Sequence, residues 1–204
     1  MNSSQSYNKN ALKHLRKDPV MKKLIETLGL LSWEGHGNDI FSALIRAIIN
    51  QQLSTKSAAT IYHRFLSLFP GQHPTPEELL QMKPDTLRAT GISYTKIGYI
   101  HGICEKIING QFCSDVLLHQ DDEDVIRELT KLKGIGAWSA EMILIATLKR
   151  PDVFSVGDLG LRTAVAKWYG VDRNNHKKIE EISLAWRPYR SLACRYLWRS
   201  LSEK

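Results

Sequence analysis

The sequence predicts an all-α protein, and three observations support this fold class. Apolar residues recur three and four positions apart through most of the chain, which is the period of an amphipathic helix. Glycine, proline and capping residues separate these periodic segments at short intervals. No segment alternates apolar and polar residues over the length of a β-strand.

The predicted elements begin after a loose polar tail at residues 2–8. Helical periodicity covers 11–31 with an interruption at Pro19, and the glycine-rich run 35–38 then breaks the chain. Asp39 can cap the helix that follows. The apolar residues of that helix follow i, i+3, i+4, i+7, i+8 spacing and are Phe41, Leu44, Ile45, Ile48 and Ile49. The remaining predicted helices are the segment around Ile61, Phe65 and Leu68, then 76–82, 84–90, 94–109, 122–132, 137–149, 158–169, 176–184 and 188–201.

Composition bounds the possible classes of protein. The chain has 204 residues, of which 43% are hydrophobic, enough to bury a core. Its net charge of +7 fits a polyanionic partner such as nucleic acid, and fits equally a basic protein with no such partner. Three cysteines without CxxC spacing argue against a disulfide framework and against a zinc or iron–sulfur site, and predict a reducing compartment. The polar N-terminus and the short apolar runs predict neither a secretory signal nor a membrane span.

The segment 132–136, Leu-Lys-Gly-Ile-Gly, lies between two amphipathic helices. Gly134 and Gly136 allow the main chain to approach another molecule closely, and the amides that begin the next helix can bind an oxyanion. Ile135 can pack between the helices and fix the turn. Such a turn would grip phosphate without reading base sequence. The alternative is an ordinary αα-hairpin with a glycine turn, and the turn alone does not decide between the two.

Four separated motifs, in the same order along the chain, resemble those of the helix-hairpin-helix glycosylase superfamily. The hairpin motif continues through Ala137-Trp138-Ser139-Ala140 and is followed by Pro151-Asp152-Val153-Phe154 and Gly157-Asp158. The other motifs are Ile48-Ile49-Asn50-Gln51-Gln52-Leu53-Ser54, Ala89-Thr90-Gly91-Ile92-Ser93-Tyr94-Thr95-Lys96 and Trp186-Arg187-Pro188-Tyr189-Arg190-Ser191. Within the superfamily the chain most resembles 3-methyladenine DNA glycosylase II and its yeast relatives, from about residue 39 to residue 198.

The resemblance implies two helical lobes with the active cleft between them. Residues 1–40 would join the C-terminal lobe 158–204, and 41–157 would form the central lobe, with the helix-hairpin-helix at 122–149. Some relatives carry an additional N-terminal β domain, for which this chain is too short.

Asp158 lies 22 residues after Gly136 and opens a predicted helix. By resemblance it matches the catalytic aspartate of the family, whose carboxylate would stabilise the positive charge that develops on the sugar when an N-glycosidic bond breaks. The alternative is that Asp158 only caps its helix, which the spacing alone favours. The order of the motifs favours the catalytic position, and the two roles can coexist.

The resemblance also assigns residues to a base pocket. Relatives that cleave the DNA backbone have a lysine two residues past the second hairpin glycine, and here that residue is Trp138, so the chain is expected to be a monofunctional hydrolase. Trp138 and Trp198 match aromatic positions that would stack on a cationic alkylated base, the alternative being that both tryptophans pack in the core. Met142 replaces a tyrosine of the family, and Gly157 replaces a second acid of the bacterial relative.

The resemblance places the DNA contacts in three segments. Gln52 would insert into the base stack, with Leu53 and Ser54 beside it at the DNA surface; otherwise this segment is an exposed polar kink. Residues 94–96, with Tyr94 and Lys96, would contact the backbone of the opposite strand. The phosphate contacts at the hairpin would be Lys131, Lys133, Gly134 and Gly136, where the lysines are otherwise solvated surface charges.

A monovalent or divalent cation can be held in this superfamily between the hairpin carbonyls and a phosphate. The matching carbonyls belong to Thr130, Leu132 and Ile135, and no other cofactor is expected.

The predicted function is a monofunctional DNA glycosylase of the 3-methyladenine type, which hydrolyses alkylated purines from DNA in base excision repair. The expected partner is double-stranded DNA with alkylated bases or abasic sites, bound by a monomer in the nucleus of a eukaryote or the cytoplasm of a bacterium. Met142, Gly157 and the small Ser54 support an alternative, a catalytically weak homologue that binds abasic or distorted DNA. A third, weaker reading is a helix-hairpin-helix scaffold for a partner protein.

Overall fold

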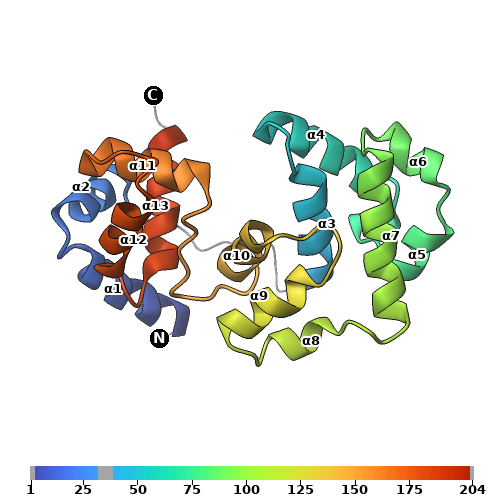
Figure 1. Cartoon of the computed structure of the whole chain (residues 1–204), viewed down its shortest axis with the longest axis horizontal. Coiled ribbons are helices and arrows are strands. Elements are labelled where there is room, and N and C mark those ends of the chain that lie inside the picture. Colours follow the sequence, from blue (N-terminus) through green and yellow to red (C-terminus); the bar gives the residue numbers. More distant parts are fainter. Residues whose placement is uncertain (1–2, 32–38, 203–204) are drawn as a thin grey trace. The chain divides into compact units, whose positions relative to one another are not determined.

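The computed structural model describes residues 3–31 and 39–202, and over these residues every regular element is a helix, which confirms the all-α prediction (Figure 1). The predicted glycine-rich break at 35–38 lies outside the described residues. The helices are α1 (Ser3–Leu15), α2 (Pro19–Leu28), α3 (Ile40–Asn50), α4 (Thr55–Leu66), the 3-10 turn η1 (Pro70–Gln72), α5 (Pro76–Gln81), α6 (Pro84–Ala89), α7 (Tyr94–Ile108), α8 (Ser114–Leu117), α9 (Asp122–Thr130), α10 (Ala137–Ala146), α11 (Leu159–Tyr169), α12 (His176–Leu184) and α13 (Arg190–Ser202).

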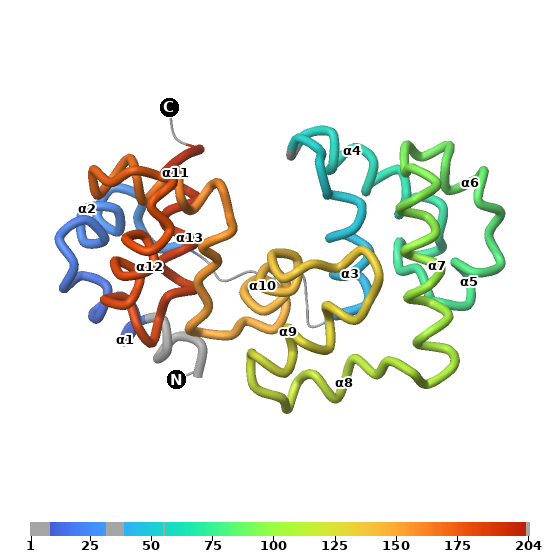
Figure 2. Tube along the Cα trace, viewed as in Figure 1, coloured from blue at the N-terminus to red at the C-terminus, as the bar shows by residue number. Residues whose placement is uncertain are grey.

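The chain divides into two compact units, each with its own core. Unit 1 combines Met1–Gly35 with Leu144–Lys204, and unit 2 is His36–Ile143. The two parts of unit 1 are far apart in sequence, but α2 packs on α13, as the trace shows at the blue and red ends of the chain (Figure 2). The sequence placed the second boundary at 157/158, whereas the segment 144–157 belongs with unit 1.

The core of unit 1 forms where α11, α13 and the N-terminal helices meet. Trp186 and Tyr196 are its largest fully buried side chains. Asp18 organises the polar part of this core: it caps α2 by accepting bonds from the amides of Val20 and Met21, and its Oδ2 accepts from the hydroxyl of Tyr169 (2.9 Å) and the indole N–H of Trp186 (3.2 Å). One carboxylate therefore joins α2, α11 and the α12–α13 connection.

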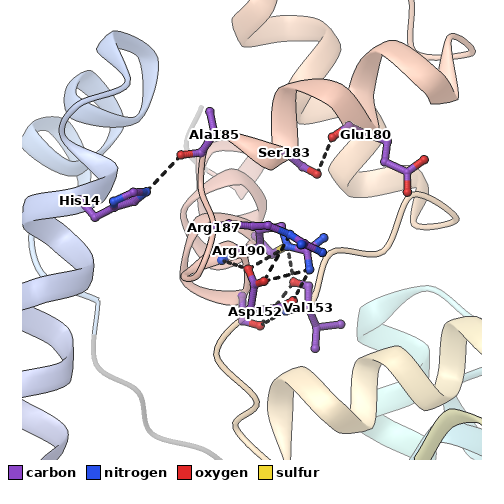
Figure 3. Close-up of polar contacts among 10 residues, drawn as sticks. His14, Asp152, Val153, Glu180, Ser183, Ala185, Arg187 and Arg190 are labelled. Carbon is purple, nitrogen blue, oxygen red and sulfur yellow. Dashed lines mark hydrogen bonds and ion pairs between the residues drawn. The ribbon is translucent and has the colours of Figure 1, made fainter. Parts of the chain in front are cut away.

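A second polar cluster fixes the start of α13. The guanidinium of Arg190 donates from Nε to Oδ1 of Asp152 (2.8 Å) and from Nη2 to the backbone oxygen of Asp152 (2.6 Å), and Arg187 Nε lies 3.5 Å from Oδ2 of the same carboxylate (Figure 3). The amide of Val153 donates to Oγ of Ser191 (2.9 Å). Two motifs that are 38 residues apart in sequence thus join, and they hold the segment that leads into α11.

The core of unit 2 is built around α7, which packs against α3, α5 and α6. The apolar face predicted for the helix after Asp39 is confirmed for four of its five residues, since Leu44, Ile45, Ile48 and Ile49 are fully buried; Phe41 is half-buried. Asp39 caps that helix through a bond from the amide of Ser42, as predicted.

Two local predictions were wrong, and one short helix was missed. Helix α1 begins at Ser3, so residues 3–8 do not form a loose tail. Helix α8 at Ser114–Leu117 was not predicted, because four residues are too few to show a period. Helix α10 ends at Ala146 rather than Lys149, and Lys149 adopts a positive φ of 54° just before Pro151.

Among the described residues, no helix combines the length and the apolar character needed to cross a bilayer.

Candidate active site and DNA-binding loops

The hairpin in unit 2 connects α9 to α10 through residues 131–136. Leu132 and Ile135 are buried beneath it, and the amide of Ile135 donates to the carbonyl of Leu132 (3.0 Å), which closes the turn. Gly136, in contrast, is exposed, and its carbonyl accepts the first bond of α10. The first amides of a helix have no partner within the helix, so this exposed start of α10 can bind an anion. Ile135 is buried, as its predicted packing role requires.

Gly134 is the position of the hairpin where a side chain would be most strained. Its φ is 93°, a region that side-chain-bearing residues rarely adopt. A Cβ atom at this position would lie 2.5 Å and 2.7 Å from ring atoms of Tyr99 on α7. Lys133 Nζ lies 6.0 Å from the centroid of the same ring. The main chain of the hairpin therefore rests directly on Tyr99.

A second loop, 51–54, follows α3. Gln52, Leu53 and Ser54 are exposed, and Gln52 has a positive φ of 58°. Ser54 also has a local role that we did not predict: its Oγ accepts from the amide of Ser57 (3.2 Å) and caps α4, and a serine directly before a helix was the available signal. An exposed Gln52 is accessible to DNA, and its insertion into the base stack remains a prediction.

Lys96 and Tyr94, the two predicted backbone contacts of α7, differ in their surroundings. Tyr94 is 57% exposed, and its hydroxyl donates to Oδ1 of Asp85 (2.6 Å). Lys96 is half-buried, and its ammonium donates to the carbonyls of Ile49 (2.9 Å) and Gln51 (2.7 Å). Partial burial lowers the pKa of Lys96. Within the structure Lys96 serves the loop 51–54, a contact that its local sequence could not reveal.

Asp158 opens α11 in unit 1 and is only 9% exposed. Its Oδ1 accepts two hydrogen bonds, from the amide of Leu161 (2.7 Å) and from the indole N–H of Trp198 (2.9 Å). The first bond confirms that Asp158 caps the helix. The second shows that two residues predicted separately as site residues, 40 positions apart, lie in direct contact.

Gly160 and Cys194 also lie close to Asp158. A Cβ atom on Gly160 would lie 3.1 Å from Oδ1 of Asp158 and 3.2 Å from Cδ1 of Trp198, so a larger residue would press on both groups. Cys194 is buried nearby, and burial, with the charge of Asp158, raises the pKa of its thiol. The thiol of Cys194 therefore stays neutral near pH 7.

The other predicted pocket residues lie in unit 2. Trp138 and Met142 lie one turn apart on α10, so they share a face of that helix. Trp138 is 42% exposed, which contradicts the alternative that it only packs in the core, whereas Met142 is half-buried. Trp198 is half-buried and bonded to Asp158, so core packing is not its whole role either.

The predicted cation site consists of the backbone carbonyls of Thr130, Leu132 and Ile135. The carbonyl of Leu132 already accepts one bond, from the amide of Ile135, and keeps a second lone pair. Neutral carbonyl oxygens suit a hard cation, and the donor set fits the group. No group of three or more His, Cys, Asp or Glu side chains that could hold a metal ion occurs in the described part of the chain.

The sequence was compared with known protein families and with individual proteins, and both comparisons found DNA repair proteins. A family model described as the HhH-GPD superfamily base excision DNA repair protein matches residues 45–188. DNA-3-methyladenine glycosylase 1 of Schizosaccharomyces pombe is 36% identical over 163 residues, covering 78% of this chain and 72% of that protein. A putative DNA-3-methyladenine glycosylase of Bacillus subtilis, YfjP, is 32% identical; the match covers 79% of this chain but only 59% of that protein.

A solved structure of the S. pombe 3-methyladenine DNA glycosylase in complex with abasic DNA superposes with a TM-score of 0.88 at 32% identity, covering 95% of this chain and 97% of that one. The family match extends over most of the sequence and includes the loop 51–54, the hairpin and Asp158. The chain belongs to the HhH-GPD superfamily of base excision DNA repair proteins.

Proposed function

We propose that the protein is a monofunctional DNA glycosylase that hydrolyses the N-glycosidic bond of alkylated purines of the 3-methyladenine type in base excision repair. The observation that carries the proposal is the carboxylate of Asp158, held by two hydrogen bonds in a member of a base excision repair family. The names of the relatives support the choice of substrate class, and the abasic DNA in the S. pombe complex is what such a reaction leaves behind.

A single carboxylate is sufficient for this chemistry. When the bond between C1′ and the base nitrogen breaks, positive charge develops on the sugar, and a fixed negative charge nearby stabilises that state. An alkylated purine such as 3-methyladenine is already cationic, so it leaves as a neutral base without a proton from the protein. The water oxygen then bonds to C1′ and loses a proton to the surrounding solvent. Asp158 would stabilise the charge and orient that water, and the hydrolysis requires no cofactor.

The structure supports the absence of a lyase step. A Schiff base requires an amine at the sugar, and Trp138 occupies the position where lyase relatives have their lysine. Lys133, on the other side of the turn, has its ammonium over the ring of Tyr99. Release of the base should therefore leave an intact abasic strand.

The remaining predicted contacts have unequal support. Trp138 is exposed at the start of α10 and can stack on a cationic base. Lys133, Gly134 and Gly136 form the hairpin that would hold a phosphate. Lys131 is weaker support, because its ammonium pairs with Glu128 at 2.7 Å.

The proposal is tested by incubating the protein with duplexes that contain 3-methyladenine, 7-methylguanine or 1,N6-ethenoadenine and measuring the released base. Release of at least one base without strand cleavage is the expected result. Tight binding of an abasic duplex with no release from any of the three would instead favour the catalytically weak homologue. No preference for damaged DNA would favour the scaffold reading.

Trp198→Phe is expected to lower the rate of base release about 10-fold with little change in duplex affinity, because the indole N–H that orients Asp158 is lost while an aromatic ring remains. The measurements are the single-turnover rate of base release and the dissociation constant for the duplex. Trp168→Phe is a matched control, since that indole N–H donates to the neutral hydroxyl of Ser200 (2.9 Å). Equal rates for the two variants would show that the Trp198 bond does not serve catalysis.

We also propose that the carbonyls of Thr130, Leu132 and Ile135 hold a monovalent or divalent cation against a DNA phosphate. Affinity for an abasic duplex should then differ between Na⁺, K⁺ and Mg²⁺ at equal ionic strength, and equal affinities would contradict the site.

The protein is proposed to act where its substrate lies, in the nucleus of a eukaryote or the cytoplasm of a bacterium. The location of a fluorescent fusion would test this.

A further inference from the structure

The two loops proposed to contact DNA in unit 2 are joined to each other by a direct hydrogen bond. Gln51, at the end of α3, donates from Nε2 to the carbonyl of Gly134 in the hairpin at 2.6 Å. The two residues are 83 positions apart in sequence. The loop that carries Gln52 is therefore attached to the hairpin by the side chain directly before Gln52.

Helix α7 supports both loops from one face. Lys96 donates to the carbonyls of Ile49 and Gln51, where α3 ends. Tyr99 lies three residues later, so its side chain is on the same face, and its ring lies against Gly134. One turn of α7 thus contacts the end of α3 through the ammonium of Lys96 and contacts the hairpin through the ring of Tyr99.

These contacts have a clear physical effect. The last carbonyls of a helix lack partners within the helix and carry the negative end of its dipole, so an ammonium there stabilises the helix end. The bonds of Lys96 fix the main chain on the N-terminal side of Gln52. Gln52 itself has a φ of 58°, which a residue with a side chain keeps only where its surroundings hold it.

We propose that Lys96, Gln51 and Tyr99 form a brace that sets the position of Gln52 relative to the hairpin, and that Lys96 acts on DNA through this brace and not as a phosphate contact. The inference rests on the proposed function, because it requires that Gln52 and the hairpin engage the same DNA. The brace lets two loops act as one rigid surface, so that phosphate held at the hairpin places the inserted side chain at a fixed distance. Gln51, Lys96 and Tyr99 are positioning residues.

The test compares two lysines of unit 2 by the salt dependence of binding. The probe is a duplex with a tetrahydrofuran abasic analogue, which needs no catalysis. A lysine that contacts phosphate contributes about 0.9 to the slope of log K against log salt, so Lys133→Met should reduce the magnitude of the slope by that amount. Lys96→Met should weaken binding about 10-fold with the slope unchanged. Lys83→Met, at an exposed position, controls for the lost charge.

A double-mutant cycle separates positioning from a general loss of structure. If Lys96 acts through Gln52, then Lys96→Met should weaken binding about 10-fold in the wild-type background but less than about twofold in a Gln52→Ala background. Lys96→Arg, which can still donate to both carbonyls, should restore most of the affinity. If Lys96→Met does not fold, Gln51→Met decides the matter, because it removes only the bond to Gly134 at nearly constant volume, and it should show the same coupling to Gln52.

The outcomes separate the brace from the function on which it rests. A reduced slope for Lys96→Met, or equal losses with and without Gln52, would overturn the brace and return Lys96 to the phosphate contacts. Wild-type protein that does not prefer the abasic duplex over an undamaged one would overturn the DNA-repair proposal itself, whatever the variants do.

Discussion

Asp158→Asn is expected to lower the rate of base release about 10³-fold, the largest effect on activity of any single substitution proposed here. The substitution removes the negative charge while leaving the geometry nearly intact. Asparagine caps helices as well as aspartate does, and its side-chain oxygen can still accept from the amide of Leu161 and the indole of Trp198. What is lost is the charge that stabilises the developing cation on the sugar.

The measurement is single-turnover release of 3-methyladenine, with affinity for the abasic analogue measured beside it. Affinity should change less than about threefold, because binding depends mainly on phosphate contacts. Asp39→Asn is the matched control, since it makes the same chemical change at the exposed cap of α3. A rate for Asp158→Asn within a few-fold of wild type would show that hydrolysis does not use this carboxylate.

The two measurements together also decide between the enzyme and its weak homologue. A fast wild type and a slow Asp158→Asn variant establish catalysis by Asp158. If wild type and variant release base equally slowly but bind the abasic duplex equally well, the fixed carboxylate serves only as a helix cap. The structure is compatible with both roles, because a carboxylate that accepts hydrogen bonds from Leu161 and Trp198 can also stabilise a nearby positive charge.

The helices could be predicted because their signals are local. Asp39 and Asp158 each cap the helix that the sequence assigned to them, and the buried face of α3 follows the helical period. Elements without a local signal were missed. Helix α8 is shorter than one period of the pattern, and the N-terminal residues of α1 are polar.

The candidate site could be predicted only in part, because its contacts join distant residues. The resemblance selected Asp158 and Trp198 as candidate site residues, but nothing in either segment shows that the two side chains meet across 40 residues. The same limit applies to Lys96, which the resemblance placed against the DNA backbone, whereas its bonds in the structure run to carbonyls more than 40 residues away. Gln51 gave no signal at all, since its partner is a backbone oxygen.

Gly134→Ala is expected to destabilise the hairpin by about 3 kcal/mol and to weaken abasic-duplex binding about 100-fold. Two effects add. Alanine at a φ of 93° is strained, and its Cβ would overlap the ring of Tyr99, so the hairpin must move away from α7. That movement would also break the bond from Gln51 to the carbonyl of Gly134. Thermal unfolding and duplex binding measure the two consequences separately.

Gly102→Ala is the matched control, because Gly102 lies within α7 and an added Cβ there would meet no atom within 4 Å. Alanine favours a helix over glycine, so this variant should unfold at the same temperature as wild type or higher, with unchanged binding. Adding Tyr99→Leu to Gly134→Ala removes the ring and should recover part of the stability, though not the backbone strain. Recovery of stability without recovery of binding would show that DNA binding needs the hairpin held against Tyr99 and Gln51. If the Gly134→Ala variant matches wild type in both thermal unfolding and duplex binding, the proposed contact of Gly134 with Tyr99 does not hold the hairpin in place.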